Sequence, residues 1–244
     1  MPGSDEKNTI WFVGAGAGDP ELITVKGRKL LDRAEVLIYA GSLVSPALVE
    51  TCPAPEKIDS WDRKLDDIVS IMIDRAKKGK RVVRLHSGDS AIFGSIVEQI
   101  AELEKAGLTV KIVPGVSSVF AAAAALTTEY TPKGVADTLI ITRPAGKTLE
   151  VDYIPELSKV PATMAFFLGS EHFSEITEKL SCPDDTPAVV IYHASWPDQK
   201  IIRGTVADIA QKAQDAGITR SALLIVGRSV LGTASGYKRS HLYS

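Results

Sequence analysis

The sequence predicts an α/β fold built from two α/β domains, and three observations support this prediction. In the first half of the chain, short apolar runs typical of buried strands alternate with segments typical of helices, which is the pattern of a parallel α/β sheet. Most of these runs end in glycine-rich or Pro-Gly turns. In the second half, apolar runs continue with fewer helical segments between them, which predicts a second sheet. We place the domain boundary at Pro114-Gly115, so that residues 1–115 form the N-terminal α/β domain and residues 116–244 the C-terminal α/β domain.

The N-terminal domain is expected to contain four strands and three helices. The expected strands cover residues 9–14 (TIWFVG), 34–39 (AEVLIY), 81–85 (RVVRL) and 109–113 (TVKIV). The expected helices cover residues 24–31, 65–78 and 96–105, and the second of them repeats apolar residues at helical spacing. Ligands of open α/β sheets bind at the carboxyl ends of the strands. We therefore expect the loops that follow Gly14, His86 and Val113 to meet at one crevice.

The C-terminal domain is expected to contain five strands and three helices. The expected strands cover residues 138–142 (TLIIT), 163–168 (TMAFFL), 188–192 (AVVIY), 201–205 (IIRGT) and 222–227 (ALLIVG). The expected helices cover residues 117–126, 173–179 and 206–216. The first of these helices begins with two serines suited to capping it, and its alanine-rich face allows a ligand or another backbone to lie close.

The composition is that of an ordinary globular protein, and it narrows the classes of function. Of 244 residues, 45% are hydrophobic and 24% charged, and the formal net charge is −2. A nucleic-acid-binding surface normally shows as a basic stripe, and no long run of Lys and Arg is present, so we expect no nucleic-acid partner. The cysteines, Cys52 and Cys182, lack metal-binding spacing, so no metal site is expected. Residues 1–8 show no secretion signal and no apolar run is long enough to span a membrane, so we expect a cytoplasmic protein with free thiols and no membrane partner.

The first glycine-rich loop is VGAGAGDP, at residues 13–20. Glycines after a strand let the backbone turn tightly and approach a ligand closely. A dinucleotide fingerprint, GxGxxG, is the first hypothesis, but its third glycine would fall on Asp19. The next predicted strand also ends in Tyr39 and Ala40, without the acidic residue that would hold a ribose. Both mismatches weigh against a nucleotide-dependent oxidoreductase, and a glycine turn without a ligand remains an alternative.

Two further loops also follow predicted strands. The loop LHSGDSAIFG, at residues 85–94, places the Asp89 carboxylate at a strand end, where it can accept hydrogen bonds from ribose hydroxyls or an amino group. The alternative is a turn in which Asp89 caps a helix. The loop VPGVSS, at residues 113–118, ends in Ser117 and Ser118, whose alternative role is to cap the following helix.

These three loops, in this order and at these distances, resemble those of the tetrapyrrole methylase family. Its members carry VGxGPGDPxLLT near the N-terminus, then GDPxxFG, then PGxSSxxAAAA. The resemblance continues through Arg143-Pro144, FLG at 167–169, YHASWPDQ at 192–199 followed by GT at 204–205, and ALLIVG at 222–227, and it covers almost the whole chain. Within the family, residues 38–44, 84–89 and 193–199 are most similar to the precorrin-4 C11-methyltransferases of aerobic or anaerobic cobalamin synthesis.

The resemblance implies a fold, a cofactor and a set of contacts. It implies the tetrapyrrole methylase fold, with S-adenosylmethionine (SAM) in a cleft between the two domains, and a homodimer. Carried over position by position, the implied SAM contacts are Ala17, Ser87, Gly88, Asp89, Ile92, Ser117, Ser118, Leu168, Ala194 and Ala222. The chain departs from the family pattern where Ala17 and Ser90 each replace Pro and where Leu168 replaces Met. The first two changes loosen their loops, and the third removes a thioether while nearly conserving volume.

The implied activity is that of a SAM-dependent methyltransferase in cobalamin (vitamin B12) and porphyrin biosynthesis, which methylates C11 of precorrin-4 to give precorrin-5. Because the methyl donor is already activated, the enzyme has to align the reacting atoms and exclude water. No catalytic residue is assigned from the sequence. Asp89, His86 and His193 are candidates for a general base near the expected cleft.

The tetrapyrrole partner carries several carboxylates, which predicts cationic contacts. Arg84, Lys133, Arg143 and Arg203 lie near predicted loops and are the candidates, with solvated surface charge as the alternative for each. Other functions also stay open. They are methylation of cobalt-precorrin-4, of uroporphyrinogen III or of another ring position, diphthine synthesis on a protein substrate, SAM sensing without catalysis, and nucleotide-dependent oxidoreduction.

Overall fold

The computed structural model describes residues 8–146, 149–236 and 238–239, and it has the α/β fold that the sequence predicts. The chain divides into two compact units, Met1–Ser118 and Val119–Ser244. Each unit contains one five-stranded sheet. The division therefore falls three residues beyond the boundary expected from the sequence, because the last residues of the Pro-Gly loop belong with the first sheet.

The first unit is a parallel sheet with helices on both faces. Its strands are β1 (Thr9–Gly14), β2 (Val36–Tyr39), β3 (Glu56–Asp59), β4 (Val82–His86) and β5 (Thr109–Val113), in the order β3-β2-β4-β1-β5. All neighbouring pairs run parallel. Its helices are α1 (Val25–Leu31), α2 (Pro46–Thr51), α3 (Leu65–Lys77) and α4 (Val97–Lys105), with short 3-10 turns at Pro20–Leu22 and Gly41–Leu43. The parallel arrangement brings the carboxyl ends of β1, β4 and β5 to the same edge of the sheet.

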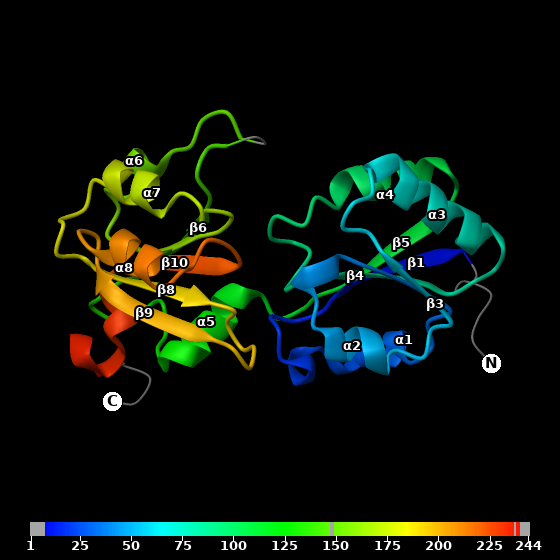
Figure 1. The fold of residues 1–244 in the computed structure, drawn as a ribbon, viewed down its shortest axis with the longest axis horizontal. Helices are drawn as coiled ribbons and strands as arrows, with labels where there is room; N and C mark the ends of the chain where they lie inside the picture. The colour runs from blue at the N-terminus through cyan, green and yellow to red at the C-terminus, as the bar shows by residue number, and fades with distance from the viewer. Residues whose placement is uncertain (1–7, 147–148, 237, 240–244) are drawn as a thin grey trace. The chain divides into compact units, whose positions relative to one another are not determined.

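Figure 1 shows α3 and α4 on one face of this sheet and α1 and α2 on the other. Successive strand residues point to opposite faces. Phe12 accordingly packs into the cluster that contains Met72 of α3 and Leu103 of α4. Val13 packs into the cluster that contains Leu31 of α1 and residues around α2. Both faces of the sheet are therefore covered, which explains why its central strands are continuous apolar runs.

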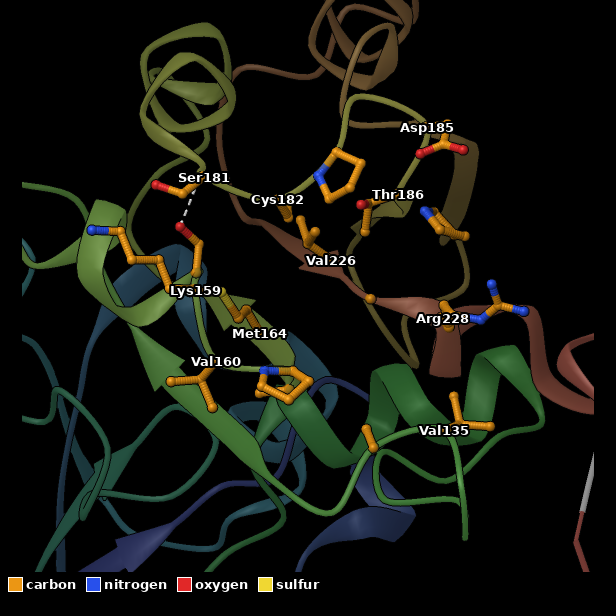
Figure 2. Close-up of a pocket in the computed structure, with 17 residues that line it drawn as sticks. Val135, Lys159, Val160, Met164, Ser181, Cys182, Asp185, Thr186, Val226 and Arg228 are labelled. Carbon is orange, nitrogen blue, oxygen red and sulfur yellow. Dashed lines mark hydrogen bonds between the residues drawn. The ribbon is translucent and has the colours of Figure 1, made fainter.

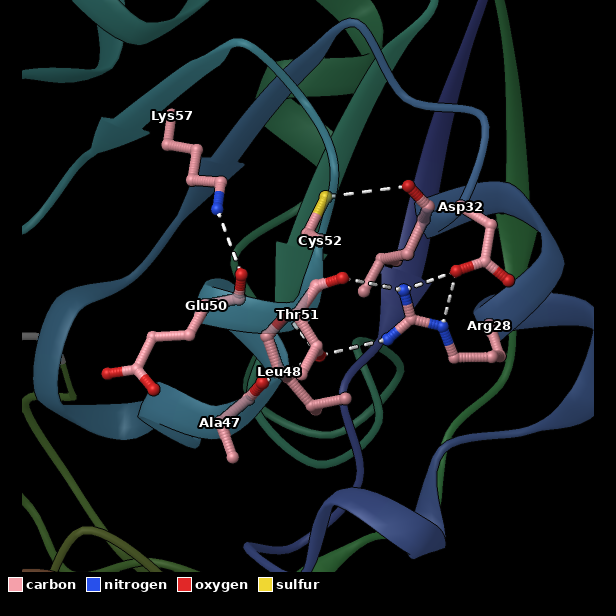
Figure 3. A network of polar contacts seen from close by, with 9 residues as sticks. Arg28, Asp32, Ala47, Leu48, Glu50, Thr51, Cys52 and Lys57 are labelled. Carbon is pink, nitrogen blue, oxygen red and sulfur yellow. Dashed lines mark hydrogen bonds and ion pairs between the residues drawn. The ribbon is translucent and has the colours of Figure 1, made fainter.

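A small polar network joins α1 to α2, as Figure 3 shows. The Arg28 guanidinium donates to the Asp32 carboxylate, with Nε at 2.9 Å from Oδ1, and to the Thr51 hydroxyl at 3.3 Å. The thiol of Cys52 lies 3.4 Å from the carbonyl oxygen of Leu31. These bonds fix two short helices that would be marginal in isolation.

Two elements of the first unit were not expected from the sequence, β3 and α2. Strand β3 is EKID, a polar segment at the edge of the sheet in which half-buried and exposed residues alternate. It lacks the apolar signal of the other strands, and the Arg75 guanidinium of α3 holds its Glu56 carboxylate at 2.7 Å. Helix α2 has six residues and starts at a proline, so it is too short to show a helical period.

The second unit has a mixed sheet. Its strands are β6 (Leu139–Thr142), β7 (Thr163–Phe166), β8 (Pro187–Tyr192), β9 (Lys200–Thr205) and β10 (Ala222–Val226), in the order β6-β7-β10-β8-β9. Only β6 and β7 pair in parallel among these neighbours; the other three pairs are antiparallel. The helices are α5 (Ser118–Leu126), α6 (Ile154–Leu157), α7 (Phe173–Lys179) and α8 (Ile209–Asp215), and a 3-10 segment follows at Arg228–Ser235. The expected strands are confirmed, and the four-residue α6 is an addition.

The core of the second unit lies between its sheet and α6, α7 and α8, which Figure 1 shows on one face, with α5 on the other. Phe166, Ile176 and Ile209 are completely buried there. Buried polar groups on the other side are paired. The Thr163 hydroxyl donates to the Tyr130 carbonyl oxygen at 2.6 Å and lies 2.6 Å from the Ser229 hydroxyl. In the part of the chain that the structure describes, no helix combines the length and apolar character needed to cross a membrane.

Candidate functional site

The loops after β1 and β4 are hydrogen-bonded to each other. The Ala15 amide donates to the His86 carbonyl oxygen at 2.7 Å. Gly16 and Gly88 then exchange backbone hydrogen bonds in both directions, at 2.8 and 3.2 Å. Both glycines have positive φ, of 82° and 60°, which other residues adopt only with strain. The expectation that these loops meet is confirmed.

The loop after β5 joins them through Asp89 and through close glycine contacts. The Asp89 carboxylate accepts the Gly115 amide on Oδ2 and the Ala91 amide on Oδ1, both at 2.7 Å. A Cβ added to Gly14 would lie 2.5 Å from the Gly115 Cα atom, so no side chain fits between these two loops. Glycine is required here because one backbone packs directly on another.

Seven of the ten expected SAM contacts lie on these three loops. Gly88 and Ser117 are buried beneath the surface, and Ser87 is exposed. The remaining four are partly exposed: Ala17, Asp89, Ile92 and Ser118. The structure therefore brings all seven to the carboxyl edge of the first sheet.

The other three expected contacts lie together in the second unit. Leu168 follows β7, Ala194 follows β8, and Ala222 begins β10. Because β10 runs antiparallel to both β7 and β8, these positions share one edge of the sheet. The Ser170 hydroxyl bonds the backbone of Ala222 at 3.1 Å and fixes this edge. Leu168 is 64% exposed, which leaves an apolar side chain open at the edge.

Backbone strain marks the same loops and was missed by sequence reasoning. Among the described residues, seven non-glycine residues have φ between 47° and 70°. Such conformations cluster at binding and catalytic sites. Six of the seven lie on the segments that carry the expected contacts or directly beside them: Phe93, Ser95, Leu168, His193, Ser195 and Ser221. Residue type alone reveals such φ values only at glycine, so no sequence signal identified them.

Two of the candidate bases are constrained by their surroundings. His86 is 7% exposed and stacks on Phe12 at 5.5 Å. Burial, with the nearby charge of Arg84, lowers the pKa of His86 to about 3, so the ring is neutral and a weak base at neutral pH. Asp89 uses both carboxylate oxygens to hold backbone amides. Neither side chain is therefore suited to act as the general base.

His193 has a different setting. Its Nδ1 lies 2.9 and 3.0 Å from the carboxylate oxygens of Asp198. Its ring stacks on Tyr192 at 3.8 Å and on Trp196 at 5.0 Å. The hydrogen bond to His193 lowers the pKa of Asp198, so this carboxylate stays ionised and favours the tautomer with the proton on Nδ1. That tautomer leaves Nε2 as an acceptor.

The four candidate cations lie on different elements, with Arg84 in the first unit and the other three in the second. Arg84 is buried in the first unit, 5% exposed. Lys133 donates to the carbonyl oxygen of Arg239 at 3.1 Å, and Arg203 donates to that of Val230 at 3.1 Å. Arg143 is partly buried just after β6.

A cavity of about 430 Å³ lies in the second unit, with Lys159 and Arg228 on two of its sides, as Figure 2 shows. It is lined by Met164 at the start of β7 and Val226 at the end of β10, so it lies at the opposite edge of the sheet from the expected contacts. None of the ten expected residues lines it. Within the described ranges, no group of three or more His, Cys, Asp or Glu side chains could hold a metal ion.

Comparison with known proteins agrees with this geometry. The model of the family "Tetrapyrrole (Corrin/Porphyrin) Methylases" matches residues 9–210. The chain is 47% identical to a cobalt-precorrin-4 C(11)-methyltransferase of Methanocaldococcus jannaschii, over 91% of this chain and 88% of that one. It is 41% identical to a precorrin-4 C(11)-methyltransferase of Pseudomonas aeruginosa, over 96% and 95%.

The backbone of a solved structure is also similar to that of this chain. That structure is a cobalt precorrin-4 methyltransferase of cobalamin biosynthesis, and it superposes with a TM-score of 0.89 at 40% identity, covering 94% of this chain and 99% of that one. The likeness in sequence and in backbone thus extends across both units. The chain belongs to the tetrapyrrole methylase family.

Proposed function

We propose that this protein is a C-methyltransferase of cobalamin biosynthesis that transfers a methyl group from SAM to C11 of precorrin-4, giving precorrin-5. The observation that carries the proposal is the 47% identity, over 91% of the chain, to a relative named for C11 methylation. SAM is the methyl donor of tetrapyrrole methylases. The joined loops of the first unit support the assignment, because the matching motifs occupy one edge of a sheet.

We propose that SAM is held at the ten expected positions. On the first unit, the proposed contacts are Ala17, Ser87, Gly88, Asp89, Ile92, Ser117 and Ser118. On the second unit they are Leu168, Ala194 and Ala222. The side chains are mostly small, so backbone groups are accessible to a ligand, and the exposed Leu168 offers an apolar surface for a flat ring. Strained backbone next to Leu168, Ala194 and Ala222 is consistent with a binding role.

When bound, SAM supplies an electrophilic methyl group on a sulfonium. The chain then has to hold the ring carbon in line with that methyl group and keep water away. The rigid junction of Gly14, Gly16, Gly88 and Gly115 suits this task, because backbone packed on backbone cannot relax by side-chain rotation.

We propose His193 as the group that accepts the proton lost from the tetrapyrrole. Asp198 holds its Nδ1, two aromatic rings fix the plane of the imidazole, and Nε2 is left as the acceptor. His193→Gln should lower kcat by about 10²-fold or more, with little change in SAM affinity. Asp198→Asn should also lower kcat with little change in SAM affinity, because the carboxylate that holds His193 Nδ1 is lost.

The first experiment is calorimetry of the purified chain with SAM, S-adenosylhomocysteine and NAD. We expect saturable binding of SAM and its demethylated product and no response to NAD. Leu168→Asp should weaken SAM binding, with Leu231→Asp as the control, since Leu231 is also exposed in the second unit. Tight binding of NAD without a response to SAM would refute the proposal.

Turnover then identifies the tetrapyrrole. Precorrin-4, cobalt-precorrin-4 and uroporphyrinogen III are offered separately with SAM labelled in its methyl group, and the product is located by mass and by NMR at C11. Methylation of uroporphyrinogen III alone would contradict the assignment of the ring position. The identity to the Methanocaldococcus jannaschii enzyme makes cobalt-precorrin-4 the second candidate substrate.

We also propose that the protein acts as a homodimer in the cytoplasm. Light scattering on the eluting protein should give twice the mass of the 26.1 kDa chain. A mass of one chain at micromolar concentration would contradict the dimer.

A further inference from the structure

Three polar side chains of the first unit are buried with an atom that has no hydrogen-bond partner among the described residues. The side chains are Arg84, His86 and Ser90, which are 5%, 7% and 2% exposed. The unpartnered atoms are Arg84 Nη1, His86 Nε2 and Ser90 Oγ. Native proteins pair nearly all buried polar atoms. Three such atoms within seven residues of sequence call for a partner outside the described chain.

Two of these side chains share a face of β4, and one of them, Arg84, contacts α4. Arg84 and His86 are two residues apart on the strand, so they point to the same side. The Arg84 guanidinium reaches the first turn of α4, where Nε donates to the Gln99 Oε1 atom at 3.4 Å. The Gln99 amide in turn donates to the Ser95 carbonyl oxygen at 3.1 Å. Gln99 therefore holds the guanidinium at the amino end of the helix.

This guanidinium is a buried charge at the amino end of a helix. Burial lowers the pKa of Arg84 to about 10, so the side chain remains charged at neutral pH. Asp59 acts on it electrostatically, but no ion pair to Arg84 is formed within the described residues. Helix α4 has Ile96 at its N-cap, which offers no side-chain acceptor to the first amides. A helix amino end of this kind attracts an anion.

We infer that Arg84, the amino end of α4, His86 and Ser90 form a binding site for a ligand carboxylate. The two oxygens of a carboxylate match the fork of the guanidinium. They also accept from the Ser90 hydroxyl and from a ring N–H of neutral His86. The inference rests in part on the proposed function, because a tetrapyrrole acid side chain and the methionine portion of SAM both carry a carboxylate.

Ser90 adds to this site a hydroxyl group that the shared loop pattern lacks. The family pattern has Pro at this position, which provides no hydroxyl. Two residues that follow Ser90 on the same loop, Phe93 and Ser95, have φ of 52° and 47°.

The first test uses sodium acetate, which is independent of methyl transfer. Acetate is titrated at constant ionic strength while the ring NMR signals of His86 and the thermal unfolding are followed. We expect a saturable shift of the His86 signals and a raised Tm in the wild type, both lost in Arg84→Met. Arg84→Lys keeps the charge without the fork and should respond more weakly, and Ser90→Ala should do the same. Arg33→Met, at an exposed arginine of the same unit, is the matched control and should respond as the wild type.

The acetate experiment alone tests whether this site binds a carboxylate. No saturable response in the wild type, or equal responses in the wild type and Arg84→Met, overturns the inference. If Arg84→Met does not fold, Arg84→Lys and Ser90→Ala provide the comparison, and wild-type responses in both would overturn it equally.

A second test identifies the source of the carboxylate. If it belongs to SAM, Arg84→Met should weaken SAM binding by roughly 10- to 100-fold and leave decarboxylated SAM unaffected. If it belongs to the tetrapyrrole, the KM for precorrin-4 should rise by a similar factor with SAM affinity unchanged. Unchanged affinities for both would contradict the inference and leave the proposed function intact. A wild type that responds to acetate but never binds SAM would contradict the proposed function alone.

Discussion

Acidification from pH 7 to pH 5 is expected to destabilise the first unit through His86. Burial and the charge of Arg84 lower the pKa of this imidazole from 6.5 to about 3. Between these values the unfolded chain binds a proton that the folded chain does not, so the stabilisation is complete above 6.5 and falls as the pH drops toward 3. Each pH unit in this window costs about 1.4 kcal/mol. Integrated from pH 7 to pH 5, His86 alone removes about 2 kcal/mol.

The measurement is urea unfolding of the wild type and His86→Phe at pH 7, 6 and 5, with amide exchange in β1 and β4 reporting the first unit separately. The phenyl ring keeps the stacking on Phe12 and does not titrate. The difference in unfolding free energy between the two proteins should therefore change by about 2 kcal/mol across the range. His172→Gln, at a partly exposed histidine of the second unit, should keep the wild-type pH dependence. Parallel loss of stability in the wild type and His86→Phe would refute the buried, neutral state of His86.

Three substitutions test the contacts that hold each unit. Asp89→Asn should cost about 1–3 kcal/mol in chemical denaturation, because its amide nitrogen cannot accept the Gly115 amide that Oδ2 now binds at 2.7 Å; an unchanged midpoint would contradict this. Gly14→Ala should abolish a cooperative melt in circular dichroism, because the new Cβ lies 2.5 Å from the Gly115 Cα, and a wild-type melt would show that the junction can open. Thr163→Val should lower the thermal stability of the second unit by about 1–3 kcal/mol, because it removes the 2.6 Å bond to the Tyr130 carbonyl, and a wild-type Tm would argue that this bond contributes nothing.

The strands of both sheets were predictable because burial on both faces leaves a continuous apolar run in the sequence. Val82–His86 and Ala222–Val226 are entirely buried and were identified within a residue or two. Glu56–Asp59 was missed because an edge strand needs apolar residues on one face only, and here the signal reduces to Ile58. The strand order of the second sheet was not predictable either, because the sequence of a short strand does not encode which neighbour it pairs with.

The loops of the candidate site were predictable from glycine spacing and order, but their interactions were not. Asp89 was expected to face a ligand, and the structure shows both of its oxygens bound to backbone amides, one of them 26 residues away. His86 was a candidate base, and its burial beside Phe12 and Arg84 makes it neutral. Both outcomes depend on long-range packing, which local sequence does not record. The positive φ of Leu168 and His193 is likewise a tertiary effect.

The contact between Gly14 and Gly115 has a consequence for how such sequences are compared. A Cβ at either position would clash with the other loop, so both glycines are required for the chain to fold, whatever the loops bind. A descendant that lost its cofactor would still need them. The glycine pattern therefore identifies an intact scaffold, and a search intended to find active enzymes should weight His193 and Asp198, which the scaffold does not require.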